Sequence, residues 1–216
     1  MNPNNISGER LQLEALISSS KSNSKQIILD IYDKAKYFFD TDSAHDFSHV
    51  LRVMKNALEI AKDENGDPDV LIIASLLHDI CNFPKNHPKR HLSSEYSAKK
   101  AEEIINQTNF HKNKIPTIKD AILCHSFSRG LSPKTLDGKI FQDADRLDAI
   151  GATGIARTFM LEGKFDAAVY SIEDPFLKDG RELNDKQNSL DHFYTKLFSI
   201  KDKILNLMRN NFCNFQ

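Results

Sequence analysis

The sequence predicts an all-helical fold, and three observations support this prediction. From Lys25 onward, apolar residues recur every three or four positions along most of the chain, which is the spacing of amphipathic helices. The periodic runs end at typical helix boundaries, such as Asn65-Gly66 and the Asp67-Pro68 pair that begins the next run. No stretch of strand length alternates between apolar and polar residues, so we expect no sheet of consequence.

The expected helices follow one another along residues 25–208. The clearest is a run of apolar residues at helical spacing, which comprises Val50, Val53, Met54, Ala57, Leu58 and Ala61. Thr41-Asp42-Ser43 supplies a turn and a cap before it. The complete set of expected helices is Gln26–Phe39, Val50–Ala61, Val70–Ile80, Ser94–Ile105, Ile118–His125, Lys139–Ile150 and Leu190–Met208. Around Asp174–Gly180, prolines and glycines predict an irregular stretch.

Length and composition limit the organisation and the class of the protein. The 216 residues suit one helical domain over 25–216, preceded by an extension over 1–24 with one short amphipathic piece at Leu11–Ile17. The 29 basic and 30 acidic residues nearly balance, so nothing indicates a binder of nucleic-acid polymers. The polar N-terminus lacks the apolar core of a secretory signal, and no apolar run approaches the roughly 20 residues of a membrane span. The three widely spaced cysteines, Cys81, Cys124 and Cys213, predict no disulfide framework and favour the cytoplasm.

The first candidate site lies where the most apolar helix ends. The run from Val70 to Leu77 contains one polar residue, Ser75, and is followed directly by His78 and Asp79. A buried carboxylate is costly unless it is paired or bound to a cation. Imidazole and carboxylate are both good metal ligands, so a metal ion would satisfy the two groups together. The alternative is a hydrogen bond between them at the helix end, with Asp79 partly solvated.

A second candidate group lies on the preceding helix. His45, His49, Arg52 and Asn56 recur at i, i+4, i+7 and i+11, so they form one polar stripe at the edge of the apolar face. Two histidines one turn apart could ligate a metal or hold a phosphate. For His45, at the expected helix start, a capping or supporting role is favoured, and for His49 a metal ligand. The alternative is a solvated helix flank.

The third candidate group is a set of aspartates on the helix Lys139–Ile150. The buried face of this helix is defined by Ile140, Ala144 and Leu147. Asp145 and Asp148 lie on one side of that face and Asp143 lies on the other. Spacing therefore favours Asp145 or Asp148 as a fourth ligand, beside two imidazoles and Asp79. The alternative is that all three are surface charges, with Arg146 as a partner.

Taken in order, these residues resemble the pattern H…HD…D of the HD-domain superfamily of metal-dependent phosphohydrolases. The resemblance rests on His49, His78-Asp79 and Asp145 and covers roughly Phe39–Arg157. Longer stretches are similar to small bacterial HD hydrolases that include nucleotide pyrophosphohydrolases; they are His45–Val53, Cys124–Ser128, Phe141–Gly151, Asp174–Phe176 and Asp191–Leu197. Enzymes of this superfamily that hydrolyse guanosine 3′-pyrophosphates carry an acidic pair after the HD dipeptide. Residues 80–84 contain no acid, which speaks against that activity.

The resemblance implies a compact helical HD-domain bundle with the metal at its centre. Its ligands would be His49, His78, Asp79 and Asp145, with Asp143 as a rival because the subgroup carries both aspartates. The cofactor would be a divalent ion, Mn²⁺ or Mg²⁺ with Fe²⁺ as a further possibility, and two histidines favour Mn²⁺ over Mg²⁺. A metal-bound hydroxide would attack a nucleoside triphosphate and release the monophosphate and pyrophosphate.

Catalysis would also need a base and an acid. Asp79 or Asp143 could accept the proton of the attacking water, and His125 could protonate the leaving group or contact a phosphate. The alternative for His125 is a helix-terminal histidine that interacts with the helix dipole.

Positive and polar groups around the candidate site could bind the phosphates of the substrate. Lys85 and Arg90 lie on the loop that leaves the HD dipeptide, Arg52 shares the stripe of His49, and Ser126 follows His125. The alternative for the two loop residues is an ordinary solvated loop.

Two other functions remain open at this stage. The same metal chemistry could serve another nucleotide, as a phosphomonoesterase or phosphodiesterase, or the chain could be a regulatory module that binds a metal or nucleotide without turnover. The expected partner is a small phosphoester, and a homodimer is possible, although no exposed apolar stripe demands one.

Overall fold

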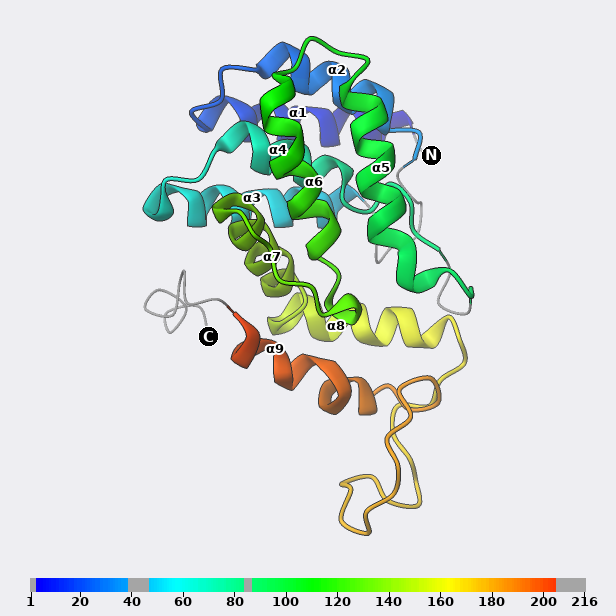
Figure 1. Cartoon of the computed structure of the whole chain (residues 1–216). Coiled ribbons are helices and arrows are strands. Elements are labelled where there is room, and N and C mark those ends of the chain that lie inside the picture. The colour runs from blue at the N-terminus through cyan, green and yellow to red at the C-terminus, as the bar shows by residue number, and fades with distance from the viewer. Residues whose placement is uncertain (1–2, 39–46, 84–86, 205–216) are drawn as a thin grey trace. The chain divides into compact units, whose positions relative to one another are not determined.

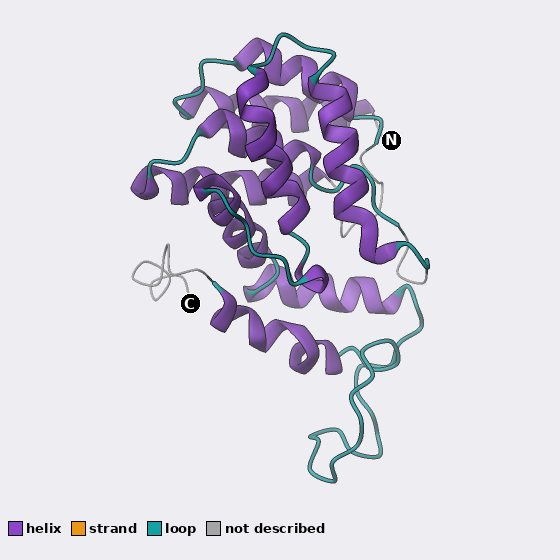
Figure 2. Ribbon diagram, viewed as in Figure 1, coloured by secondary structure: helices purple, strands orange, loops and turns teal. Residues whose placement is uncertain are grey.

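The computed structural model describes residues 3–38, 47–83 and 87–204, and it divides into two compact units, Met1–Asp145 and Arg146–Gln216. Figure 2 shows helices joined by loops, and the strand-like feature of the described part is one isolated bridge between Ala168 and Asn188. The all-helical prediction is therefore confirmed for the described residues. None of their helices has the length and apolar character needed to cross a membrane. The extension over 1–24 and the single domain over 25–216 stay a prediction.

The first unit is built around one buried helix, α4 (Pro68–Leu77). It contacts four others, α2 (Lys25–Ala35), α3 (Phe47–Glu64), α5 (Ser93–Ile105) and α6 (Ile115–Cys124) (Figure 1). Every residue from Val70 to Leu77 is buried, as the apolar run predicts. The remaining elements are α1 (Pro3–Ser19), the short 3₁₀ turns η1 (Arg90–Leu92), η2 (Lys112–Lys114) and η3 (Phe127–Arg129), and α7 (Leu136–Asp148), which crosses into the second unit.

Both ends of α4 are fixed by side chains. Asp67 caps the first turn by accepting hydrogen bonds from the backbone N–H groups of Asp69 and Val70, and Pro68 occupies the first turn. The helix ends at Leu77, three residues before the predicted end at Ile80. At this end the Ser75 carbonyl accepts a hydrogen bond from Nδ1 of His78, at 2.9 Å, and the Cys81 N–H donates to the Ser97 hydroxyl on α5, at 3.1 Å. His78 and Asp79 consequently lie in the turn that leaves the buried helix.

Several predicted features fall outside the described residues. They are the turn at residues 41–43, His45, Lys85, Cys213 and the ends of the predicted helices Gln26–Phe39 and Leu190–Met208.

The second unit contains one helix that the sequence pattern does not predict. This helix, α8 (Gly151–Gly163), buries Gly154, Thr158 and Glu162 along one face. Because none of the three is a large apolar residue, hydrophobic periodicity gives no signal there. Gly154 approaches the Ala149 carbonyl so closely that a Cβ atom would lie 2.1 Å from its oxygen, which excludes any side chain at this position.

The last predicted helix is shorter than expected. Within Leu190–Met208, the π-helical turn η4 (Phe193–Leu197) continues into α9 (Phe198–Lys203), and Ile204 leaves the helix with an extended backbone. At the end of α9, the Lys203 carbonyl accepts a hydrogen bond from the Arg146 guanidinium. The helix therefore ends at a side-chain partner within the same unit.

The irregular stretch before η4 is held by a partly buried ion pair between Arg181 and Asp191. Arg181 donates two hydrogen bonds, of 2.7 and 2.6 Å, to the carboxylate oxygens of Asp191, which also accepts from the Asn184 N–H at 2.7 Å. The hydrogen bonds from Arg181 lower the pKa of Asp191 below its ordinary value. The ion pair therefore stabilises the native state above the ordinary pKa of Asp, and the contribution is lost as pH falls through the lowered native value.

We expect Asp191→Asn to lower the midpoint of thermal unfolding at pH 7, because the amide cannot pair with both guanidinium nitrogens. The difference from the wild type should shrink as pH falls below about 4, where protonation of Asp191 removes the same interaction from the wild type. Circular dichroism melts across this pH range measure it. Asp179→Asn, at an exposed position of the same stretch, is the control. Equal melting of D191N and wild type at pH 7 would contradict the prediction.

Candidate metal centre

Side chains from four helices of the first unit meet at the end of α4. His49 lies on α3, His78 and Asp79 follow α4, and His125 follows α6. Asp145 lies on α7, near the end of the first unit. His78 is completely buried, with an exposed fraction of 0%, and His49 is 3% exposed. The side chains of Asp79 and Asp145 are about one-fifth exposed, at 22% and 21%, so the cluster is buried on one side and open on the other.

The side chains of this cluster lie at distances that would allow them to bind one common ion. The Nε2 atoms of His49 and His78 are 3.2 Å apart. One Asp79 oxygen lies 3.6 Å from Nε2 of His78, and one Asp145 oxygen lies 3.6 Å from Nε2 of His49. Among the residues that the structure describes, His49, His78 and Asp79 each place a potential ligand atom within 4.8 Å of the other two.

The protonation state of His78 is fixed by its surroundings. Its Nδ1 lies 2.9 Å from the Ser75 carbonyl, which can only accept a hydrogen bond, so Nδ1 carries the proton. Complete burial lowers the pKa of His78 to about 4, so the ring is neutral at physiological pH. Its Nε2 therefore presents a lone pair to the interior of the cluster.

This arrangement fits a cation. The His78 lone pair and the Asp79 carboxylate are electron donors that lie 3.6 Å apart, and the Asp145 carboxylate lies beside His49 at the edge of this group. A divalent ion would satisfy them together and would relieve the repulsion between the carboxylates. Two imidazoles and two carboxylates form a mixed nitrogen and oxygen set, which suits Mn²⁺ or Fe²⁺ and favours Mg²⁺ less.

His125 lies on the other side of Asp79. Its Nδ1 donates to the Ile122 carbonyl at 2.6 Å, and its Nε2 lies 3.4 Å from the second Asp79 oxygen. Burial alone would lower the pKa of His125, but the hydrogen bond to Asp79 and the charges of Asp79 and Asp145 outweigh it and raise the pKa to about 9. The Asp79 carboxylate thus lies between a neutral His78 and a protonated His125.

Phe141 forms a wall of the cluster that sequence reasoning does not assign. Its ring contacts those of His78 and His125, with centroid distances of 5.5 and 6.3 Å. Phe141 lies one helical turn before Asp145, so the same face of α7 presents both residues, and this spacing is the signal that could have identified it.

The other aspartates of α7 have different surroundings. Asp148 pairs with Arg157 on α8 at 2.7 Å, and this pair lies within the second unit. Asp143 is buried, with an exposed fraction of 1%. Asp145 lies beside the cluster, with one carboxylate oxygen 3.6 Å from Nε2 of His49.

The predicted substrate-binding residues differ in their present contacts. Arg52 donates to Ser48 at 2.9 Å, one turn earlier on α3. Ser126 shares a hydrogen bond with Ser128 at 3.2 Å, beside His125. Arg90 donates to the Asn82 side chain at 2.7 Å and to the Phe83 carbonyl, so it braces the loop after Asp79. Lys85 lies outside the described residues.

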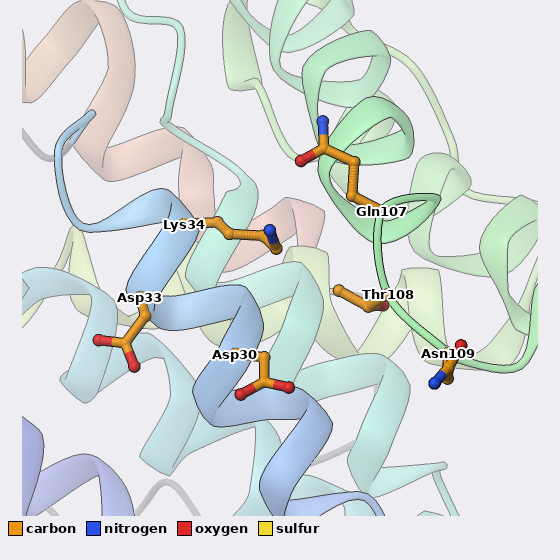
Figure 3. Close-up of a pocket in the computed structure, with 6 residues that line it drawn as sticks. All are labelled: Asp30, Asp33, Lys34, Gln107, Thr108 and Asn109. Carbon is orange, nitrogen blue, oxygen red and sulfur yellow. The ribbon is translucent and has the colours of Figure 1, made fainter.

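A polar hollow on the surface lies apart from the predicted site residues. Figure 3 shows the side chains that line it, from α2 and from the turn after α5: Asp30, Asp33, Lys34, Gln107, Thr108 and Asn109. Asp33 already pairs with Arg10 and Lys36. Because Asp33 has partners within the protein, we do not regard this hollow as a second candidate for the metal site.

Comparisons with known proteins agree with this geometry. The model of the HD domain family matches residues 46–150. The YpgQ protein of Bacillus subtilis is 34% identical over 170 residues, which cover 76% of this chain and 73% of that protein. Its crystal structure in complex with ADP is similar over 82% of each chain, at 28% identity and a TM-score of 0.56.

Two further similar proteins carry the names of enzymes. An HD-superfamily hydrolase of Bacillus thuringiensis is similar over 84% of each chain, at 27% identity and a TM-score of 0.61. A cyanamide hydratase of Saccharomyces cerevisiae is 31% identical over 111 residues, which is 49% of either chain.

Proposed function

The chain belongs to the HD domain superfamily of hydrolases, and we propose that it cleaves nucleoside triphosphates to the monophosphate and pyrophosphate with the help of a divalent metal ion. The observation that carries this proposal is the His78 lone pair, which faces His49 and the Asp79 carboxylate, with Asp145 beside His49. A relative that binds ADP supports a nucleotide as the substrate class.

The ligands of the ion would be His49, His78, Asp79 and Asp145. When bound there, a divalent ion supplies an acidified water and a positive charge for a phosphate oxygen. His78 is suited to this role because the Ser75 carbonyl fixes its tautomer and its orientation. His49 and Asp145 come from different helices, so the packing of α3 on α4 and the contact of Phe141, on α7, with His78 set the spacing of the site.

Acid and base roles follow from the position of Asp79. Its carboxylate contacts His125 through one oxygen and lies near His78 through the other, so it can accept a proton from an attacking water and orient it. The Nε2 atom of His125 faces Asp79, and a proton held there could be donated to the leaving phosphate. Asp143 remains a rival base, buried on the same helix as Asp145.

The phosphates would be bound by groups around this open side. Two candidates lie among the described residues. Arg52 follows His49 by three residues, and Ser126 directly follows His125. Lys85 is a further candidate on the loop after Asp79. Arg90 contributes indirectly by bracing that loop.

A panel of substrates tests the proposal. The purified chain, loaded with Mn²⁺ or Mg²⁺, is incubated with nucleoside triphosphates, nucleoside monophosphates, a cyclic dinucleotide and cyanamide, and the products are separated by ion chromatography. We expect nucleoside monophosphate and pyrophosphate in equal amounts, with Mn²⁺ the better ion. Inorganic phosphate from monophosphates, or cleavage of the cyclic dinucleotide alone, would favour another phosphoester. Hydration of cyanamide alone, or binding of nucleotides without turnover, would overturn the proposed reaction.

A further inference from the structure

The loop that follows Asp79 carries a cluster of aromatic rings that the proposed chemistry does not use. The Phe83 and His87 rings are stacked, with centroids 4.7 Å apart and planes inclined by 10°. Tyr96, on the first turns of α5, meets Phe83 edge to face at a centroid distance of 5.3 Å. His87 is exposed and Tyr96 is 39% exposed, so these rings form a surface and not a core.

The two stacked rings are held in place by the loop and by α5. The Phe83 N–H donates to the Ser93 hydroxyl at 3.2 Å, and the Phe83 carbonyl accepts from Arg90. The Nδ1 atom of His87 accepts from the Lys89 N–H at 3.1 Å, and the His87 carbonyl accepts from the Arg90 N–H at 3.0 Å. Because these two exposed rings are already ordered, little further conformational entropy is lost when another flat group stacks on them. This favours binding.

The platform formed by the rings of Phe83, His87 and Tyr96 also lies close to the candidate metal centre. Phe83 follows Asp79 by four residues, so their Cα atoms are at most about 14 Å apart. The N-terminal part of α5, which carries Tyr96, is tied to the end of α6 by a hydrogen bond from the Ser94 hydroxyl to the Leu123 carbonyl, at 3.1 Å. His125 follows directly. In a nucleotide, the sugar separates the base from the phosphates, so a base can rest on the platform while its phosphates reach the cluster.

From these observations we propose that Phe83, His87 and Tyr96 form the subsite for the base of the nucleotide. The base stacks on the face of His87 that is turned away from Phe83, and Tyr96 forms a side wall. Lys89, whose Nζ lies 5.8 Å from the centroid of the Tyr96 ring, provides a donor near the edge of the base. Because stacking grows with ring area, purine nucleotides bind better than pyrimidine nucleotides. This inference rests on the proposed function.

Titration calorimetry with ADP, CDP and inorganic tripolyphosphate in the presence of Mn²⁺ tests the subsite, together with the hydrolysis panel on wild type. His87→Ala is expected to weaken ADP binding by at least about fivefold, the lower bound for loss of one stacked base. It should leave the affinity for tripolyphosphate, which has no base, unchanged. His87→Phe keeps a ring and should retain ADP binding. His111→Ala is the matched control, since His111 is also an exposed histidine beside a phenylalanine, Phe110, but lies at the opposite end of α6.

The outcomes separate the subsite from the reaction. If wild type hydrolyses nucleoside triphosphates and His87→Ala binds ADP as wild type does, the subsite is wrong and the proposed function stands. Equal weakening of ADP and tripolyphosphate would also overturn the subsite, because it would show a general effect on the loop. If wild type cleaves no triphosphate but His87→Ala still weakens ADP selectively, the subsite stands and the proposed reaction falls. Wild type that binds no nucleotide overturns both.

Discussion

Turnover is expected to fall by about a thousandfold when Asp79 is replaced by asparagine. The amide has nearly the same shape as the carboxylate, so the turn after α4 should persist, but its charge is lost. Asp79 contacts both His78 and His125, so the change removes an anionic ligand and the partner of His125 together. Metal catalysis contributes several kcal/mol, and each 1.4 kcal/mol is about tenfold in rate, which leads to this estimate.

Three measurements on Asp79→Asn decide the point: the metal content after dialysis, the turnover with added Mn²⁺, and the thermal midpoint. We expect lower metal content, lost turnover and a nearly unchanged midpoint. Asp30→Asn, in the surface hollow of Figure 3, is the control that should behave as wild type. Wild-type turnover in D79N, or undiminished hydrolysis by wild type after treatment with a chelator, would refute the metal-centred mechanism.

The core of the first unit and the position of the candidate centre could be predicted because they depend on local rules. An apolar run that ends in His78-Asp79 forces a polar pair to the end of a buried helix, whatever surrounds it. The capping pair Asp67-Pro68 sets the start of that helix. Both features can be predicted from a few consecutive residues.

What the sequence could not predict depends on contacts between distant segments. The face of α8 that contains Gly154, Thr158 and Glu162 is buried although it is not apolar, so no periodicity indicates it. The partner of His125 is likewise distant in the chain: it is Asp79, in the turn after α4, and no spacing rule connects positions 46 residues apart. Spacing left Asp145 and Asp148 equivalent; the resemblance favoured Asp145, and their different neighbours in the folded chain separate the two.

Substitution of these two aspartates, which lie one turn apart on α7, is therefore expected to have opposite effects on metal binding and on stability. Asp145→Asn is expected to lower metal affinity and turnover strongly and to leave the fold intact, because its carboxylate faces His49 and is partly exposed. Asp148→Asn is expected to do the reverse. Its carboxylate is only 3% exposed and pairs with Arg157, so the change breaks this ion pair and lowers the free energy of unfolding by roughly 3 kcal/mol.

Urea unfolding and metal content, measured on both variants, give a crossed pattern if the assignment is right. D145N then loses metal and keeps its unfolding midpoint, whereas D148N keeps its metal and unfolds at lower urea. Asp143→Asn is the third arm: loss of metal there, with full retention in D145N, would make Asp143 the ligand. The comparison is informative because both carboxylates lie on one helix, so a general weakening of α7 would lower the stability of both variants alike. Only a difference in what the two side chains contact produces opposite losses.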